Sequence, residues 1–449
     1  MGLLDLIPVA LVVWIWKRKS DESGSRSSGE LSGQQSSPFD VPSSFDLTDP
    51  LHVALLDEIR YALHRRGDLM DVLLRRERKL GKILLLTLLL GAIAQTSSPL
   101  PAQLVRPTPD QLALMDQRIR AEMADNNIPG VLIGVASRGE LVHVQTYGMA
   151  NVELRVPVSD STVFEIGSIS KQFVATAVML LVEDGRLGLD DGIHEYLPNL
   201  PSEWLGVTVR QLLTHTSGIP DYEEIQTYEA YRFRFTPEQI LRVAHSRPMD
   251  FEPGTGWYYS NTGYFLLSLI AERIEGRPLG QVLRSRIFEP LGMNQTRLAD
   301  PEDIILHRAS GYWVDRMGVE LMNRDATQPS STLGAGGILS SVHDMVKWDE
   351  ALYGDQLLSE ESKAAMWTPT VLPNHDNTGY AFGWRVGQYR GYRSVSHGGM
   401  VAGFVANFMR LPDEEVAIIV FANRYRVSSG QIRDIVAETF LLRDQRVPN

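Results

Sequence analysis

The 449-residue sequence contains no cysteine. Disulfide bonds, thiolate metal ligands and a cysteine nucleophile are therefore excluded. The chain also lacks a positive net charge, since 43 Lys and Arg residues stand against 55 Asp and Glu residues, a formal charge of −12 at pH 7. A nucleic-acid partner is not expected, because phosphate binding requires a basic surface.

Several common catalytic motifs are missing as well. The ten histidines form no His-Glu-x-x-His pattern, which argues against zinc hydrolysis, and no metal or cofactor is expected. There is no Gly-x-Ser-x-Gly elbow of an α/β-hydrolase and no Walker-type phosphate loop. Gly334-Ala335-Gly336-Gly337 does not match the dinucleotide-binding pattern. We interpret it as a structural turn that could line a cleft, followed by a helix capped by Ser341.

Residues 1–100 differ in composition from the rest of the chain. Two apolar runs lie at 3–16 and 83–94. Between them are a polar linker at 20–50, which is expected to be disordered, and a weak amphipathic pattern at 51–78. The second run, with a basic flank before it and small residues after it, resembles a secretory signal. Translation from Met70 would place this signal at the N-terminus. With Met1 as the start, both runs would be short membrane segments.

Both alternatives place the chain after about residue 100 outside the cytoplasm. We therefore expect an exported protein, periplasmic or extracellular, and the second alternative adds membrane association through the apolar runs. A third interpretation, in which both runs are buried core helices, is less favoured because no core lies nearby in the sequence.

Residues 108–446 are predicted to form one catalytic domain. Strand patterns occur at 130–136 and 141–145, and again at 380–388, 403–411 and 416–422, while helical patterns occur at 109–126 and 429–442. The sequence thus predicts an α/β (α+β) fold, with an antiparallel sheet that is built from both chain ends and flanked by helices. Residues 165–375, approximately, would form an inserted, mostly helical lobe, and a small-molecule site would lie between the lobes.

Ser168-Ile169-Ser170-Lys171 precedes an apolar run at 174–182 that contains no Gly or Pro. If this run is a helix, Ser168 and Lys171 lie one turn apart on the same face at its N-terminus. The amine could then accept the proton of the hydroxyl once the pKa of the lysine is lowered. The pattern alone is weak, because about one or two copies are expected by chance in a chain of this length.

Two further stretches combine reactive side chains with glycine. Tyr259-Ser260-Asn261 lies in a loop rich in Gly, Pro and aromatic residues. By itself this stretch predicts a helix cap. The phenol and the amide could alternatively relay a proton and bind a substrate. His397-Gly398-Gly399 follows a strand pattern at 392–396 and by itself predicts a turn that a ligand could approach closely. His215 is interpreted as structural.

In this order and at this wide spacing, the three motifs resemble the serine β-lactamase and penicillin-binding protein superfamily. The chain is most similar to the class C β-lactamase-related branch, which includes D,D-carboxypeptidases, D-aminopeptidases and family VIII carboxylesterases. The stretches 212–220 and 334–348 add to the resemblance, which covers roughly residues 108–442. It implies a β-lactamase/transpeptidase-like fold and a serine hydrolase that cleaves an amide or ester in a small-molecule or peptide substrate.

The resemblance also implies a role for each motif residue. Ser168 would form the acyl-enzyme, and Lys171 would act as its base, with a pKa well below the usual value of about 10.4. Tyr259 would relay the proton to the leaving group. The backbone N–H groups of Ser168 and Met400 would form the oxyanion hole. The expected site residues are Ser168, Lys171 and Tyr259 for catalysis, and Asn261, His397, Gly398, Gly399 and Met400 for substrate binding.

Two departures from the family pattern bear on the substrate. The second motif begins with Tyr259 instead of Ser, so a Glu-activated deacylating water is not carried over. The third begins with His397 where efficient β-lactamases usually have Lys, and a neutral imidazole holds a carboxylate less firmly than an ammonium does. A D-amino-acid peptidase or carboxylesterase is therefore expected ahead of a β-lactamase. A catalytically silent peptidoglycan-binding or scaffold protein is the remaining alternative.

Overall fold

The computed structural model describes residues 104, 106–225, 232–300, 302–315, 320–324 and 327–441. All of these residues lie in one compact unit of the chain, residues 98–449. The signal-like run at 83–94, the first apolar run and the linker between them lie outside the described residues. Within the described ranges, no helix is both long enough and apolar enough to cross a membrane.

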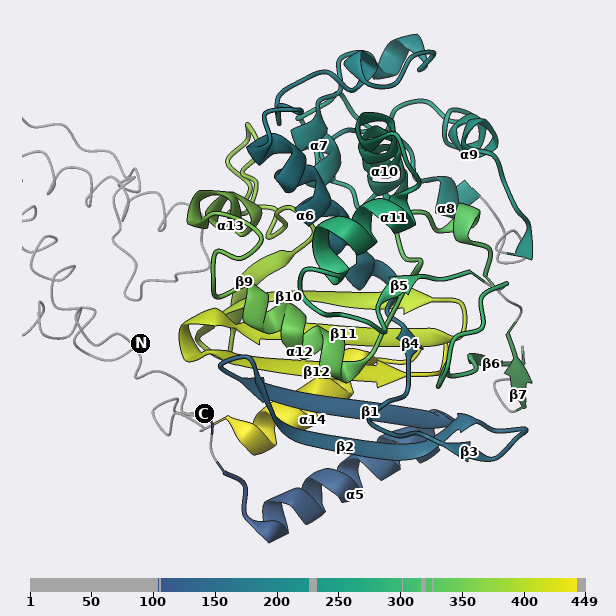
Figure 1. Ribbon diagram of the computed structural model, residues 1–449, viewed down its shortest axis with the longest axis vertical. Helices are drawn as coiled ribbons and strands as arrows, with labels where there is room; N and C mark the ends of the chain where they lie inside the picture. Colours follow the sequence, from purple (N-terminus) through teal and green to yellow (C-terminus); the bar gives the residue numbers. More distant parts are fainter. Residues whose placement is uncertain are drawn as a thin grey trace, which may run out of the picture. The chain divides into compact units, whose positions relative to one another are not determined.

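A seven-stranded antiparallel sheet is the main sheet of the fold, and it is built from both ends of the catalytic domain as predicted (Figure 1). The central strands β1 and β12 pair with Ile133 opposite Val420, so that the first and last strands of the described chain are neighbours. Every residue of β12 is buried, which agrees with the apolar pattern of this strand. In spatial order the strands are β3 (Val156–Pro157), β2 (Glu140–Asn151), β1 (Gly130–Ser137), β12 (Val416–Ala422), β11 (Phe404–Leu411), β10 (Tyr392–Val401) and β9 (Arg385–Tyr389).

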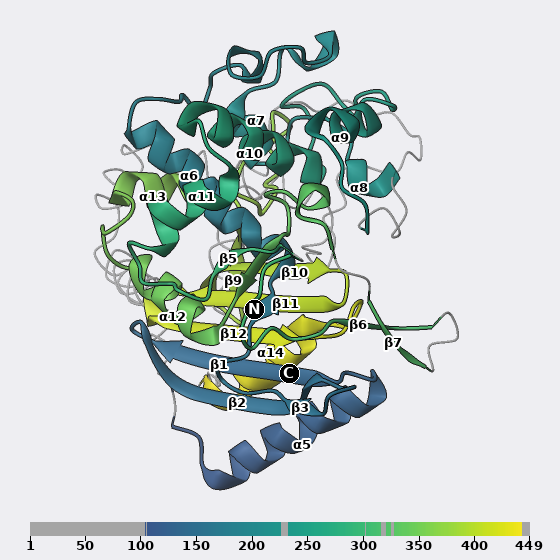
Figure 2. The same ribbon diagram turned by 45° about the vertical axis from the view of Figure 1, so that its right-hand side comes forward.

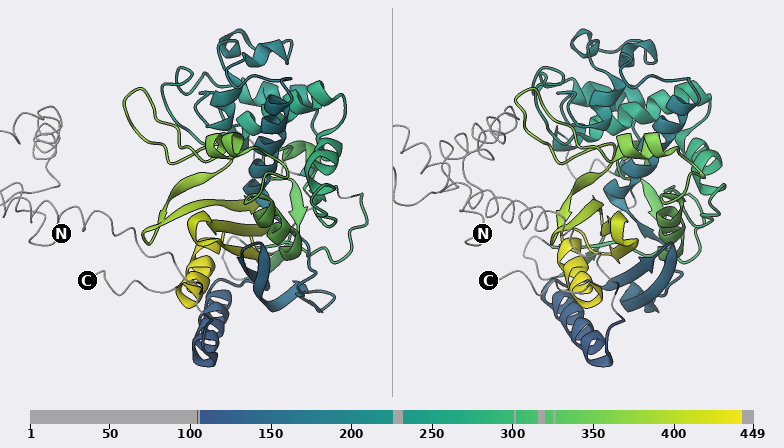
Figure 3. Two further views of the ribbon diagram at one scale, coloured as in Figure 1. Left: turned by 60° about the vertical axis from the view of Figure 1, so that its left-hand side comes forward. Right: turned by 90° about the vertical axis from the view of Figure 1, so that its left-hand side faces the viewer.

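The two faces of the sheet belong to different cores, because successive side chains of a strand point to opposite faces. Ile133 and Val420 pack with Met115 of α5 and with α14 on one face. Leu132 and Ile419 point to the other face and join the larger core, which also contains the inner sides of α6, α10 and α12. The helices therefore form two layers with the sheet between them (Figure 2, Figure 3).

Most helices lie between the two groups of strands in the sequence, which confirms the predicted helical lobe. The α-helices are α5 (Pro109–Asp125), α6 (Ser170–Glu183), α7 (Val209–Leu213), α8 (Tyr222–Ile225), α9 (Pro237–Ala244), α10 (Asn261–Glu275), α11 (Leu279–Leu283), α12 (Val342–Ala351), α13 (Glu360–Met366) and α14 (Ser429–Phe440). Short 3₁₀ turns are η2 (Gly167–Ile169), η3 (Ile193–Glu195), η4 (Ser202–Trp204), η7 (Pro329–Ser331) and η8 (Pro412–Glu414), and Arg284–Phe288 forms a π-helical turn, η6.

Two small sheets complete the described structure. In the first, the order is β4 (Phe164–Glu165), β8 (Ile338–Ser340) and β5 (Arg297–Leu298), and in the second β6 (Tyr312–Val314) pairs with β7 (Leu321–Asn323). The first of these sheets matters for the site, because β4 leads directly into η2 and α6.

The predicted turn at Gly398-Gly399 is wrong. Strand β10 continues through both glycines, with Gly398 opposite Asn407, and the chain reverses only at Ala402-Gly403. Gly403 has a φ of 80°, a left-handed conformation that glycine adopts without strain. The strand predicted at 380–388 also begins later, at Arg385.

A fully buried ion pair fastens α12 to the sheet. Arg410 of β11 and Asp349 of α12 are both 0% exposed, and the distance from Arg410 Nε to Asp349 Oδ1 is 2.5 Å. The guanidinium carbon also lies 4.5 Å from the ring centroid of Tyr353. Because neither charge reaches water, each depends on the other for compensation.

We expect Asp349→Ala to lower the free energy of unfolding by about 3–5 kcal/mol, because it leaves Arg410 charged and unpaired in the core. Urea denaturation would measure the loss. The control is Asp413→Ala, which removes an ion pair with Arg393 whose side chains are 44% and 57% exposed. A loss of less than about 1 kcal/mol is expected there. Equal losses in the two variants would contradict the prediction.

Candidate active site

The three predicted motifs meet where η2 and α6 approach strand β10. The distance from Ser168 Oγ to Lys171 Nζ is 3.2 Å, and Lys171 Nζ lies 4.8 Å from the ring centroid of Tyr259. The rings of Tyr259 and His397 are 6.1 Å apart. Ser168 and Lys171 do not share one α-helix as predicted, because Ser168 belongs to the 3₁₀ turn η2 and α6 begins at Ser170.

Two glycines let the backbone around Ser168 touch the backbone of β10. A Cβ atom on Gly399 would lie 1.9 Å from the carbonyl oxygen of Ile166, and one on Gly167 would lie 2.5 Å from the backbone nitrogen of Met400. Gly167 also has a φ of 54°. This contact brings the backbone nitrogens of Ser168 and Met400 close together, as expected for the two donors of an oxyanion hole.

Lys171 is completely buried and has three oxygen neighbours. Its Nζ donates to Asn261 Oδ1 and to the backbone oxygen of Ala335, both at 2.7 Å, and faces Ser168 Oγ at 3.2 Å. Burial lowers the pKa of Lys171 from 10.5 to about 8, against the charges of Glu223 and Asp221, which raise it. In the neutral amine, two N–H bonds go to the two carbonyl acceptors, so the lone pair is left for Ser168. This is the arrangement of a general base.

Asp221, which the sequence motifs did not indicate, fixes the orientation of Asn261. Its Oδ2 accepts a hydrogen bond from Asn261 Nδ2 at 2.9 Å. The backbone N–H of Glu223 donates to Asp221 Oδ1 at 3.0 Å. Because a carboxylate only accepts, the amide nitrogen of Asn261 must face Asp221, and the amide oxygen is left for Lys171. The only signal in the sequence is that Asp221 directly follows the stretch 212–220.

Ala335 also enters the site without a side-chain signature. The segment 334–337 was interpreted as a structural turn, and its carbonyl group at Ala335 turns out to be one of the two fixed acceptors for Lys171. Gly334 has a φ of 66°, and a Cβ there would lie 1.8 Å from Ser268 Oγ. The glycines thus allow the turn, and the turn aims the carbonyl oxygen at the amine.

The Tyr259 hydroxyl is buried and has no hydrogen-bond partner among the described residues. Burial, followed by the influence of Tyr380, raises the pKa of Tyr259 well above its usual value of 10, against a smaller opposing influence of Ser168. The side chain is therefore a neutral phenol near pH 7. It can donate a proton or a hydrogen bond, but in this neutral form it does not act as a general base.

Both ring nitrogens of His397 are already occupied. Nδ1 lies 2.6 Å from the carbonyl oxygen of Gly398, and Nε2 lies 2.9 Å from the hydroxyl of Tyr380. Since a carbonyl oxygen only accepts, Nδ1 carries the proton and Nε2 accepts from Tyr380. Burial, then the charge of Lys171, lowers the pKa of His397 to about 3. The imidazole is thus neutral, and in this arrangement it offers no donor to a substrate carboxylate.

His215 supports the loop that carries Tyr259, which agrees with its interpretation as structural. It is 1% exposed, and its Nδ1 accepts a hydrogen bond from the backbone N–H of Ser260. Its ring lies 4.3 Å from the ring of Tyr259 and 4.5 Å from that of Tyr380. Ser260 in turn caps α10, as the sequence predicted, by accepting from the backbone N–H of Gly263.

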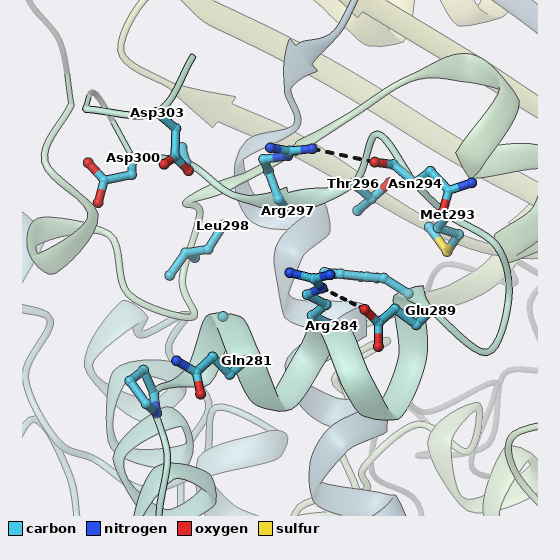
Figure 4. A pocket seen from close by; sticks show the side chains of 14 residues that line it. Gln281, Arg284, Glu289, Met293, Asn294, Thr296, Arg297, Leu298, Asp300 and Asp303 are labelled. Atoms are coloured by element: carbon cyan, nitrogen blue, oxygen red, sulfur yellow. Dashed lines mark hydrogen bonds and ion pairs between the residues drawn. The ribbon is translucent and has the colours of Figure 1, made fainter. Parts of the chain in front are cut away.

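A separate cavity of about 550 Å³ lies between α11 and β5 (Figure 4). Arg284, which is paired with Glu289, and Arg297 are among the fourteen residues that line it, and none of the predicted site residues does. In the part of the chain that the structure describes, no three His, Asp or Glu side chains gather in a way that could hold a metal ion.

Comparison with known proteins connects this geometry to one family. A family model described as Beta-lactamase matches residues 115–439. Penicillin-binding protein 4* of Bacillus subtilis (strain 168) is 32% identical over 306 residues, which cover 64% of this chain and 67% of the relative.

Two solved structures extend the similarity to three dimensions. The octameric penicillin-binding protein homologue from Pyrococcus abyssi has a TM-score of 0.64 at 30% identity, covering 73% of this chain and 77% of that one. D-amino acid amidase from Ochrobactrum anthropi SV3, complexed with L-phenylalanine amide, has a TM-score of 0.64 at 27% identity, covering 74% of this chain and 98% of that one. The predicted β-lactamase/transpeptidase-like fold is thereby confirmed.

Glycines on two neighbouring strands, β10 and β9, allow a matched test of the backbone contact. In Gly399→Ala, the new Cβ would lie 1.9 Å from the Ile166 carbonyl oxygen, so β10 and η2 must separate. We expect kcat to fall by about 10²–10³, the usual cost of losing one oxyanion-hole donor. Gly387→Ala, on the neighbouring strand β9, is the control, because a Cβ there would meet no atom within 4 Å. Hydrolysis of a chromogenic ester by folded protein measures both, and equal activities would refute the prediction.

Proposed function

We propose that this chain, which belongs to the β-lactamase family and is a serine hydrolase, cleaves an amide bond through an acyl-enzyme on Ser168. The observation that supports the proposal most directly is the position of Lys171, whose two carbonyl acceptors orient its nitrogen toward Ser168 Oγ. A scaffold or binding protein would not need a buried lysine of lowered pKa beside a half-exposed serine.

Acylation begins with the neutral amine of Lys171. It takes the proton of Ser168 Oγ as this oxygen attacks the substrate carbonyl carbon, and the resulting oxyanion accepts hydrogen bonds from the N–H groups of Ser168 and Met400. The new ammonium on Lys171 is held by Asn261 Oδ1 and the Ala335 oxygen. The nearby negative charge of Asp221 stabilises it further.

The tetrahedral intermediate then collapses with breakage of the C–N bond. The Tyr259 hydroxyl, neutral because its pKa is raised, gives its proton to the leaving nitrogen and regains one from the Lys171 ammonium. Water next attacks the acyl group on Ser168. Its proton passes back through the same groups, Ser168 Oγ is reprotonated, and the acid is released.

The substrate that we propose is an amide of a D-amino acid, or a short peptide with a D-residue and a free amino group at its N-terminus. His397 is neutral and engaged on both nitrogens, so a carboxylate on the leaving group gains no anchor there. The negative charges of Glu223 and Asp221, which act on Lys171, would instead attract a cationic ammonium on the substrate. Similarity to the D-amino acid amidase supports the D configuration.

A fluorophosphonate probe and intact-mass analysis test the nucleophile. We expect wild-type protein to gain one adduct, Ser168→Ala to gain none, and hydrolysis of D-amino acid amides by Ser168→Ala to fall to background. Ser170→Ala is the matched control, because Ser170 Oγ accepts from the Ile338 N–H and does not face Lys171. Turnover in Ser168→Ala would exclude the acyl-enzyme.

A substrate panel separates the alternatives within the family. Preference for D over L amino acid amides agrees with the proposal. Faster hydrolysis of nitrocefin than of any amide or ester would identify a β-lactamase instead, and absence of any adduct on the wild-type protein would identify a silent member.

The acylation rate should rise with pH and level off above an apparent pKa of about 8, because only the neutral form of Lys171 accepts the proton. Asp221→Asn removes a negative charge that raises this pKa, so the midpoint should move to lower pH. Stopped-flow acylation measures the profile. Glu203→Gln, at an exposed residue paired with His245, is the control and should leave the midpoint in place. A midpoint that does not move in Asp221→Asn would contradict this assignment.

A further inference from the structure

A buried ion-pair network connects the chain just before Ser168 with the chain just after Met400. Its centre is Glu165 of β4, which is 1% exposed and shortly precedes Ser168 in the chain. Arg324 pairs with both carboxylate oxygens of Glu165, with Nη1 at 3.0 Å from Oε2. Arg308 approaches the same carboxylate, with Nη2 at 3.2 Å from Oε1.

Arg324 also contacts the segment that follows Met400. Its Nη1 donates to the backbone oxygen of Ala402 at 2.7 Å and to Thr327 Oγ1 at 2.7 Å. Ala402 lies at the turn that ends β10, just after Met400. One guanidinium therefore joins the segment that precedes Ser168 to the segment that follows Met400.

The surroundings hold this guanidinium in one position. Its side chain is 6% exposed, and its central carbon lies 4.8 Å from the ring centroid of Phe404. A Cβ on Gly403 would lie 2.6 Å from Arg324 Cδ, and one on Gly311 would lie 2.9 Å from it. Two glycines thus leave space for the arginine side chain, and Gly403 does so in a left-handed conformation.

We propose that Arg324 is a positioning residue for the oxyanion hole. By linking the Glu165 carboxylate to the Ala402 carbonyl, it fixes the separation of the Ser168 and Met400 N–H groups. A donor stabilises the transition state only when it lies about 2.7–3.1 Å from the place of the oxyanion, so a small displacement is costly. A buried ion pair is weak evidence for stability alone, whereas a rigid, planar, five-donor guanidinium is well suited to holding two backbone segments.

Arg308 provides the matched control for this inference, which rests on the proposed acyl-enzyme on Ser168. Both arginines contact the carboxylate of Glu165, but the other bond of Arg308 goes to the Asp300 carbonyl oxygen, at 3.4 Å. Either single substitution therefore leaves Glu165 with one arginine partner. Only the loss of Arg324 also breaks the connection to Ala402.

The experiment compares Arg324→Gln with Arg308→Gln on an ester and on the matching thionoester. The thionoester places a sulfur, a weak hydrogen-bond acceptor, in the oxyanion hole, so the ratio of kcat/KM for the two substrates reports on the N–H donors. In Arg324→Gln we expect kcat for the ester to fall by about tenfold or more, with KM changed by less than about threefold, and the ratio to shrink. In Arg308→Gln both quantities should stay within about threefold of wild type.

A second variant covers the case in which Arg324→Gln does not fold. Arg324→Lys keeps a cation beside Glu165 but lacks the planar fork, so it should fold and still show a reduced ester-to-thionoester ratio. A ratio equal to wild type in folded Arg324 variants, or equal losses in the Arg324 and Arg308 variants, would overturn the positioning role. Wild-type protein that forms no adduct on Ser168 would instead refute the proposed function, before any arginine variant is compared.

Discussion

The backbone contact between Ile166-Gly167 and Gly399-Met400 is the constraint on which the site depends. No side chain fits between these segments, since a Cβ on Gly399 would lie 1.9 Å from the Ile166 carbonyl oxygen. The contact places Ser168 against the edge of β10, and α6 then starts at Ser170 and carries the chain into the helical lobe. Sheet and lobe are therefore joined at the nucleophile itself, and the groups around Lys171 are arranged from this point.

The charge state of Lys171 results from two opposing influences. Burial by itself would make the amine neutral and a poor acceptor of a proton, while the acidic groups by themselves would keep it a permanent ammonium. With both present, the pKa of Lys171 falls only to about 8. Near neutral pH the amine can then be either protonated or neutral. A group that receives the Ser168 proton and later returns it needs both states. Asp221 contributes twice, through its charge and through its hydrogen bond to Asn261.

Residues with recognisable chemistry could be predicted from the sequence, and residues that act through geometry could not. The strands of the sheet follow from alternation and apolar runs, and Ser168, Lys171 and Tyr259 are indicated by the family resemblance that the three motifs carry together. Ala335 contributes only a carbonyl oxygen, which every residue possesses, so its sequence carries no signal. The local pattern at Gly399 predicts a turn, because it cannot show that another backbone segment packs against this residue. Arg324 bonds to segments that are distant in the chain, and only the folded structure brings them together.

The protonation state and tautomer of His397 determine the charge and the hydrogen-bonding capacity of the third motif. Efficient β-lactamases usually have a cationic lysine at this position of the third motif. In this chain, His397 donates its Nδ1 proton to the Gly398 carbonyl oxygen and accepts at Nε2 from the hydroxyl of Tyr380. Burial, and then the charge of Lys171, lowers the pKa of His397 to about 3, so the imidazole stays neutral. The site is therefore uncharged at this position. A negatively charged substrate group thus gains no attraction from His397, whereas a cationic group is favoured by the negative charges that Glu223 and Asp221 bring near Lys171.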